Sequence, residues 1–152
     1  MSLIHSVMWS IHVGFAILWT GSVLFVTAAV LPPATRGEIG AEALTYVVGR
    51  LRWITRISAV AFVVSGGHMA GNVYTVETLT GTGSGHLVLT MIALWLVITG
   101  LVEAAGGTVV GGLDAGTPGE AAREAKTLFY VATALSVVLI ATAGLLANPF
   151  GV

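Results

Sequence analysis

The chain has 152 residues, of which 56% are hydrophobic and only 9% are charged, and its mean hydropathy is +0.96. This composition excludes an ordinary soluble domain and indicates a membrane protein. The formal net charge of -1 leaves no basic surface for nucleic acid, and the absence of cysteine excludes disulfides, thiolate metal sites and thiol redox chemistry.

Four apolar stretches follow one another along the chain, at residues 3–31, 54–76, 87–105 and 128–147. A helix needs roughly 20 apolar residues to cross a bilayer, and these runs are continuous rather than alternating as in a membrane β-barrel. We therefore predict an all-α fold, a single four-helix transmembrane bundle over residues 1–152. The expected helices cover residues 3–31, 36–76, 86–105 and 118–147.

Helix-breaking and capping residues suggest where the first connection lies. Pro32 and Pro33 are expected to end the first helix, because proline lacks the N–H that a continuing helix needs. Thr35 and Glu38 have capping-box spacing and predict that the second helix begins near Arg36.

The two later connections have different compositions. Residues 72–85 are rich in Thr and Gly and predict a short outer loop. After Glu103 the chain is rich in glycine as far as Gly112, which predicts an inner connection. Pro118 suits the first position of the last helix.

The cationic residues indicate how the bundle is oriented. All six lie in the first and third connections or beside them: Arg36, Arg50, Arg52, Arg56, Arg123 and Lys126. Because cytoplasmic loops retain Lys and Arg, we predict a multi-pass protein of the cell membrane with both termini extracytoplasmic. The first stretch is long enough to span and has its positive charge after it, so we expect it to be retained rather than cleaved as a signal peptide. Glu103 is expected to pair with one of the arginines.

All four histidines lie toward the predicted outer side of the membrane. His5 and His12 are seven residues apart, about 10 Å along one helix face, while His68 and His86 belong to the second and third helices. Three of them have an ordinary interpretation: His5 and His86 as interfacial polar residues, and His68 as a hydrogen-bonding partner of a neighbouring helix. His12 has no obvious structural reason to be there, so we favour it as a ligand.

Imidazole binds haem iron, copper or zinc, and it is the only strong ligand type on this side of the chain. We predict an integral membrane b-type haem protein with His12 and His86 as axial ligands and His68 as the substitute or neighbouring partner. Its role would be electron transfer, or haem-dependent redox catalysis, with a membrane quinone or an external redox partner. Since a small bundle buries little surface around a porphyrin, we also expect a homodimer.

Copper is the alternative cofactor. Met8 lies between His5 and His12, and Met69 follows His68. A thioether beside imidazole suits copper(I), so the same region could belong to a copper transport or transfer protein with His5, His12 and His68 among its ligands.

Residues 11–25, IHVGFAILWTGSVLF, resemble the first-helix signature of the CopD family of copper-resistance membrane proteins and the HemJ-type protoporphyrinogen oxidases. The resemblance continues through RLRWITRISAVAFVVSG (residues 50–66) and GHLVLTMIAL (residues 85–94). It implies copper handling or haem chemistry, with His12 at the matching ligand position. His86 stands where the oxidase pattern has Lys, which argues against porphyrinogen oxidation and favours bis-His ligation.

Overall fold

The computed structural model describes residues 3–147, and this part of the chain is helical throughout apart from short connections. One continuous helix is formed by α1 (Leu3–Phe25), η1 (Val26–Val30) and α2 (Leu31–Thr35). It is followed by α3 (Ala41–Val73), the short α4 (Val76–Gly81), α5 (Gly83–Asp114) and α6 (Pro118–Ala147).

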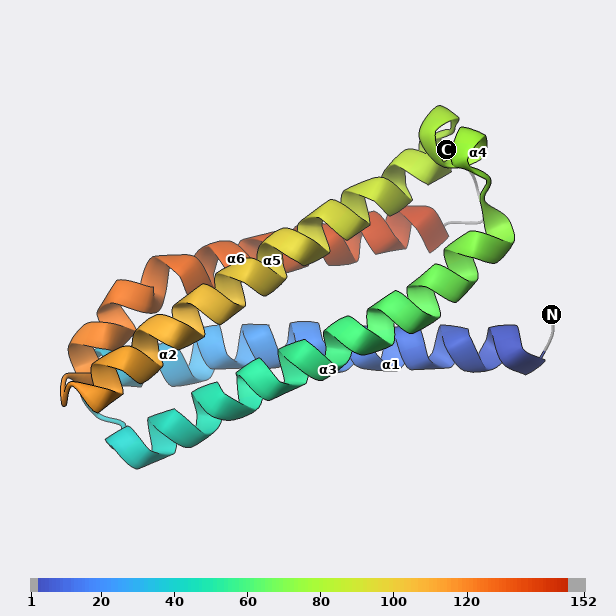
Figure 1. Ribbon diagram of the computed structural model, residues 1–152. Coiled ribbons are helices and arrows are strands. Elements are labelled where there is room, and N and C mark those ends of the chain that lie inside the picture. Colours follow the sequence, from blue (N-terminus) through green and yellow to red (C-terminus); the bar gives the residue numbers. More distant parts are fainter. Residues whose placement is uncertain (1–2, 148–152) are drawn as a thin grey trace.

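The long helices run alternately in opposite directions (Figure 1). The start of α1, the end of α6 and α4 lie at one end of the molecule, which we call the α4 end. α2, the start of α3 and the turn between α5 and α6 lie at the other, which we call the charged end. α1 packs mainly on α3, and α5 packs mainly on α6, so the bundle consists of two helix pairs.

Three helical segments are long and apolar enough to cross a membrane: Leu3–Thr35, Gly83–Asp114 and Pro118–Ala147. Large apolar side chains point outward from the bundle, with Leu3 81%, Ile17 69% and Val60 66% exposed. Soluble monomers rarely expose so much apolar surface. The chain is therefore an all-helical, multi-pass membrane protein whose exposed surface suits lipid.

The first helix does not end at Pro32 and Pro33, contrary to the sequence-based prediction. It continues to Thr35, and the prolines occupy the first turn of α2. Backbone N–H groups in the first turn of a helix have no intrahelical partner, so the missing N–H of proline costs little there. The preceding turn is the π-helical segment η1, in which the N–H of Leu31 donates to the carbonyl of Val26. This wider turn accommodates the prolines without breaking the helix.

The predicted capping box at Thr35 and Glu38 is also wrong, because α3 begins only at Ala41. The Thr35 hydroxyl donates to the carbonyl of Pro32, and Glu38 instead accepts two hydrogen bonds from the Arg36 guanidinium, which hold the pKa of this carboxyl below its usual value. Gly37 turns the chain between the helices with a φ of 74°.

The connection over residues 72–85, predicted as a short loop, contains the helix α4. Thr75 caps this helix: its hydroxyl accepts from the N–H of Thr78, whose hydroxyl in turn accepts from the N–H of Thr75. Gly85 packs against the backbone of Leu79, and a Cβ at Gly85 would collide with it. This close backbone contact holds α4 against the start of α5.

α5 extends to Asp114 rather than ending near residue 105, because its glycines serve helix packing instead of breaking the helix. A Cβ at Gly106 would lie 2.7 Å from Cδ of Arg52, and one at Gly112 would collide with Ala121 of α6. The helix ends where Gly116 adopts a φ of 75°, and Pro118 takes the first position of α6.

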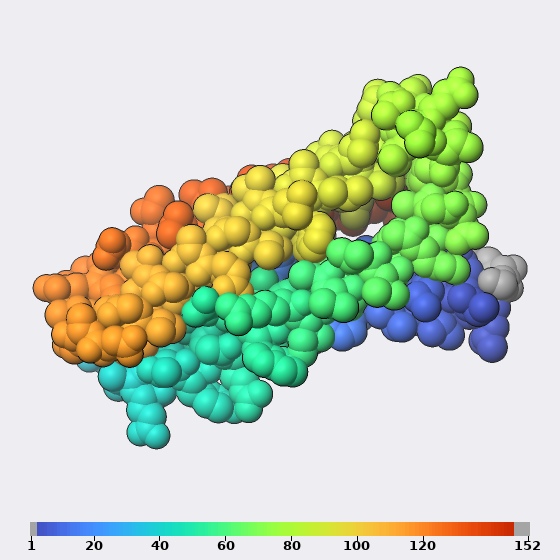
Figure 2. Space-filling model, in the orientation of Figure 1, coloured from blue at the N-terminus to red at the C-terminus, as the bar shows by residue number. Residues whose placement is uncertain are grey.

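The tightly packed core lies in the half of the bundle toward the charged end. It includes Trp19, Val48, Ile98, Val102 and Phe129, each no more than 1% exposed. Between the level of Trp19 and Ile98 and the α4 end, the described helices bury only Ser65, Gly85 and Thr142. Figure 2 shows an opening between α3 and α5 in this half of the molecule.

Candidate functional site

His12 lies in the open half of the bundle, on α1 where it faces α3. Its Nδ1 is 3.0 Å from the hydroxyl oxygen of Ser65. The Ser65 hydroxyl donates its own proton to the carbonyl of Ala61, so it can only accept from the imidazole. Nδ1 of His12 therefore carries the proton, and Nε2 is left with a free lone pair.

Gly66 makes room for this imidazole. A Cβ at position 66 would lie 3.2 Å from Cε1 and 3.5 Å from Nδ1 of His12, which is tighter than most packed side chains allow. Gly67, the next residue, has open space at its Cβ position. The close approach of α3 to the His12 ring is thus specific to position 66.

A row of aromatic rings connects His12 with the second helix pair. Phe62 of α3 lies 5.2 Å from His12, 5.7 Å from Trp19 and 6.3 Å from Trp95 of α5, measured between ring centroids. The Trp19 indole N–H donates to the hydroxyl of Thr55, 3.1 Å away, and anchors the row in the core. The rings therefore link the two helix pairs through apolar contacts.

His5 and His68 form a second histidine group, nearer the α4 end. Their ring centroids are 6.4 Å apart, with an angle of 48° between the ring planes. Two imidazoles that bind one ion through metal–nitrogen bonds of about 2 Å have ring centroids at most about 6 Å apart, when the two bonds are nearly opposite. The pair is therefore at the upper limit of the separation at which two rings share a metal ion.

His86 lies on the other helix pair and is not brought together with His12. Its side chain is exposed, and its Nε2 is 2.7 Å from the carbonyl oxygen of Thr80. Because a carbonyl only accepts, Nε2 of His86 is the donor and the ring ties α4 to the start of α5. Among residues 3–147, no three His, Asp or Glu side chains lie close enough together to hold one metal ion.

The two methionines of the copper alternative are placed differently. Met8 lines a groove on the outer surface of α1 and α3 together with Ile11 and Val64. Met69 is partly buried on α3 beside His68. Because the Met8 side chain lines this outer groove, the copper alternative rests on His5 and His68, whose rings lie near each other.

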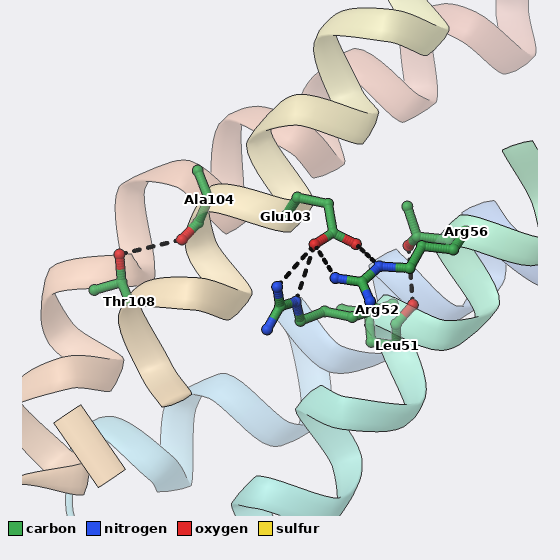
Figure 3. A network of polar contacts seen from close by, with 7 residues as sticks. Leu51, Arg52, Arg56, Glu103, Ala104 and Thr108 are labelled. Atoms are coloured by element: carbon green, nitrogen blue, oxygen red, sulfur yellow. Dashed lines mark hydrogen bonds and ion pairs between the residues drawn. The ribbon is translucent and has the colours of Figure 1, made fainter. Parts of the chain in front are cut away.

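Glu103 of α5 binds two arginines of α3, as Figure 3 shows. Both Nε and Nη2 of Arg52 lie 3.0 Å from Oε2 of the carboxylate, and Arg56 donates from Nε and Nη2 at 2.9 Å. The predicted pairing of Glu103 with an arginine is confirmed, and Glu103 binds two arginines rather than one. This cluster joins α3 to α5 toward the charged end.

Sequence reasoning singled out His12 but missed the residues that hold its ring, namely Phe62, Ser65 and Gly66. A serine followed by two glycines in an apolar helix is the available signal, since small and hydroxyl residues allow close helix contact. The comparisons with known proteins add no further residue. No family model, no curated protein and no solved structure matches this chain.

Proposed function

We propose that this chain is a membrane haem protein in which Nε2 of His12 supplies an axial ligand for electron transfer. The observation that carries the proposal is the hydrogen bond between His12 and Ser65. Histidine ligands typically donate their second ring N–H to an oxygen, which fixes the ring and makes the free nitrogen a better ligand. The Ser65 hydroxyl provides that oxygen to His12.

The surroundings of His12 fit a porphyrin. Phe62 lies 5.2 Å from the His12 ring and 6.3 Å from Trp95 of the other helix pair, so aromatic rings extend from His12 toward α5. Such apolar rings suit the faces and edges of a macrocycle, and burial among them would help to set its potential. When bound, haem would supply one-electron chemistry; the protein would hold it, exclude water and keep the His12 ring in place.

For the second axial ligand we retain His86, with His68 as the substitute. His86 belongs to the helix pair opposite His12, so the two would hold the group between the pairs. To bind through Nε2, its ring would first have to release the carbonyl of Thr80. His86→Ala and His68→Ala distinguish the two, since only the variant that removes the second ligand converts a low-spin spectrum to high-spin.

The bundle is proposed to span the membrane four times, with α3 as the remaining span and both termini outside. The six Lys and Arg residues support this orientation, because all of them lie between α2 and α3, in the first half of α3 or near the start of α6. Since the chain has no cysteine, Glu77→Cys and Glu120→Cys give single labelling sites. In intact cells an impermeant maleimide should label position 77 only; labelling of position 120 alone would reverse the orientation.

The electron partners are proposed as a membrane quinone or an external redox protein, and a homodimer would enclose more of the porphyrin.

The HemJ-like alternative, oxidation of a porphyrinogen, predicts turnover of that substrate by the haem-loaded protein. A protein that only transfers electrons would not turn over a porphyrinogen.

The test is the spectrum of the protein purified in detergent after haem supplementation, recorded oxidised and reduced. Low-spin Soret and α bands in proportion to the protein are expected. Absence of these bands, in protein that remains helical by circular dichroism, would reject haem binding.

A copper transport or transfer function is the second candidate, and the 6.4 Å separation of the His5 and His68 rings favours it. Copper(I) titration of the purified protein should then give tight binding without a visible chromophore. His68→Ala should abolish this binding, while His86→Ala should leave it unchanged. Haem bands that depend on His12, without copper binding, would decide against this candidate.

A further inference from the structure

An apolar groove of about 510 Å³ runs along the outer surface where α1 meets α3. Met8 and Ile11 line its α1 side, Ile57, Val60 and Val64 line its α3 side, and Arg56 lies at the end nearer the charged end. The groove shares no lining residue with His12, with the row of aromatic rings or with the His5 and His68 pair, so neither the haem nor the copper proposal uses it.

The groove has the length of a lipid chain within one leaflet. From Arg56 to Val64 it extends along about 12 Å of helix, close to the roughly 15 Å of hydrocarbon in half a bilayer. Its lining is almost entirely aliphatic, and Val60 is 66% exposed within it. A flexible acyl chain would cover these side chains.

The arginine end of the groove carries uncompensated positive charge. Glu103 is the single carboxylate that binds both Arg52 and Arg56, so the three side chains together have a net charge of +1. Arg56 uses Nε and Nη2 for Glu103, and its side chain is 61% exposed. Its Nη1 donors therefore remain for an anion outside the cluster.

Measured from the start of α5, the cluster lies about one hydrocarbon thickness along the helix, the level expected of lipid phosphates at the opposite interface. Glu103 lies about 30 Å along α5 from Gly83, which is the thickness of the hydrocarbon core. Arginine at this level extends its head toward the interface, where phosphate accepts paired N–H bonds from guanidinium.

We propose that the groove and the Arg56 guanidinium form a binding site for one anionic glycerophospholipid. Its phosphate binds Arg56 next to Glu103, and one acyl chain lies between α1 and α3. The net positive charge selects an anionic lipid over a zwitterionic one, and the groove selects a lipid over a free phosphate. This site is independent of any haem or metal.

Native mass spectrometry of the whole chain in detergent tests the site, with phosphatidylglycerol and phosphatidylcholine of identical acyl chains as probes. Two variants with matched controls separate headgroup from groove. Arg56→Gln removes the anion site, whereas Arg50→Gln removes an arginine that instead lies over the Tyr46 ring. Val60→Trp fills the groove, whereas Val63→Trp changes a valine of similar exposure, 62%, that does not line it.

We expect one phosphatidylglycerol to be retained, with retention falling roughly tenfold in Arg56→Gln, as for loss of a charge-assisted contact, and in Val60→Trp. Arg50→Gln and Val63→Trp should retain it as the parent does. Equal retention of phosphatidylcholine, or equal losses in the control variants, would overturn the proposal. So would displacement of the lipid by inorganic phosphate at equal concentration, which would indicate a free-phosphate site only.

Discussion

Nδ1 of His12 lies 3.0 Å from the hydroxyl of Ser65, 53 residues further along the chain. The serine hydroxyl donates to the carbonyl of Ala61, which leaves the imidazole as the donor. One hydrogen bond thus sets both the orientation and the tautomer of His12. It also joins α1 to α3 in the half of the bundle that is otherwise loosely packed.

Ser65→Ala is expected to weaken haem binding by about 10- to 100-fold, because loss of a hydrogen-bond partner of a ligand typically has this effect. The measurement is haem titration of the purified protein. Ser58→Ala is the matched control: this serine is also buried on α3, and its hydroxyl has no hydrogen-bond partner within residues 3–147. Equal effects of the two substitutions would mean that the Ser65 hydroxyl does not position His12.

Gly66→Ala is expected to displace the His12 ring by a few tenths of an ångström and to weaken haem binding, since the new Cβ would lie 3.2 Å from Cε1. Gly67→Ala, with open space at its Cβ, should leave binding unchanged and favour the helix slightly. Haem affinity and the position of the Soret band report the difference. An unchanged affinity and band in Gly66→Ala would show that the ring tolerates the contact without functional effect.

Much of the fold follows from local sequence. Continuous apolar runs predict long helices, and the arginine and lysine positions separate the two ends of the bundle. The extension through Pro32 and Pro33 was not predictable, because it depends on the π turn that precedes them. The length of α5 was missed because Gly106 and Gly112 resemble helix breakers until their neighbours Arg52 and Ala121 are known.

The candidate site could be predicted only in part, for a related reason. His12 is conspicuous as a polar residue in an apolar helix, and direction along each helix places His5 and His68 on the same side. The partners are decided by packing between distant segments. Ser65 and Phe62 approach His12 only when α1 and α3 meet, and the bond from His86 to Thr80 depends on α4, which looked like a loop.

Glu103→Gln is expected to lower the free energy of unfolding by about 1 kcal/mol, as for a partly exposed ion pair, because two guanidiniums lose their shared carboxylate. Reversible unfolding in mixed micelles gives this value. Glu124→Gln, which changes an exposed carboxylate on α6, serves as control and should have little effect. If Glu103→Gln matched the control, the cluster would contribute nothing to stability.

Gly112→Ala is expected to destabilise the bundle by about 1–3 kcal/mol, because the added methyl collides with Ala121 and forces α5 and α6 apart. Gly111→Ala adds the same methyl into open space and should instead stabilise α5 by up to about 1 kcal/mol. The sign of the difference in unfolding free energy between the two variants is the result to examine. Stabilisation by both would contradict close helix packing at Gly112.

The most direct test of the central claim is the reduced-minus-oxidised spectrum of His12→Ala beside that of the parent protein, after identical haem supplementation. If Nε2 of His12 is an axial ligand, the low-spin α band of the parent will be lost in the variant while its helical content is retained. An α band of unchanged position and intensity in His12→Ala would contradict the account.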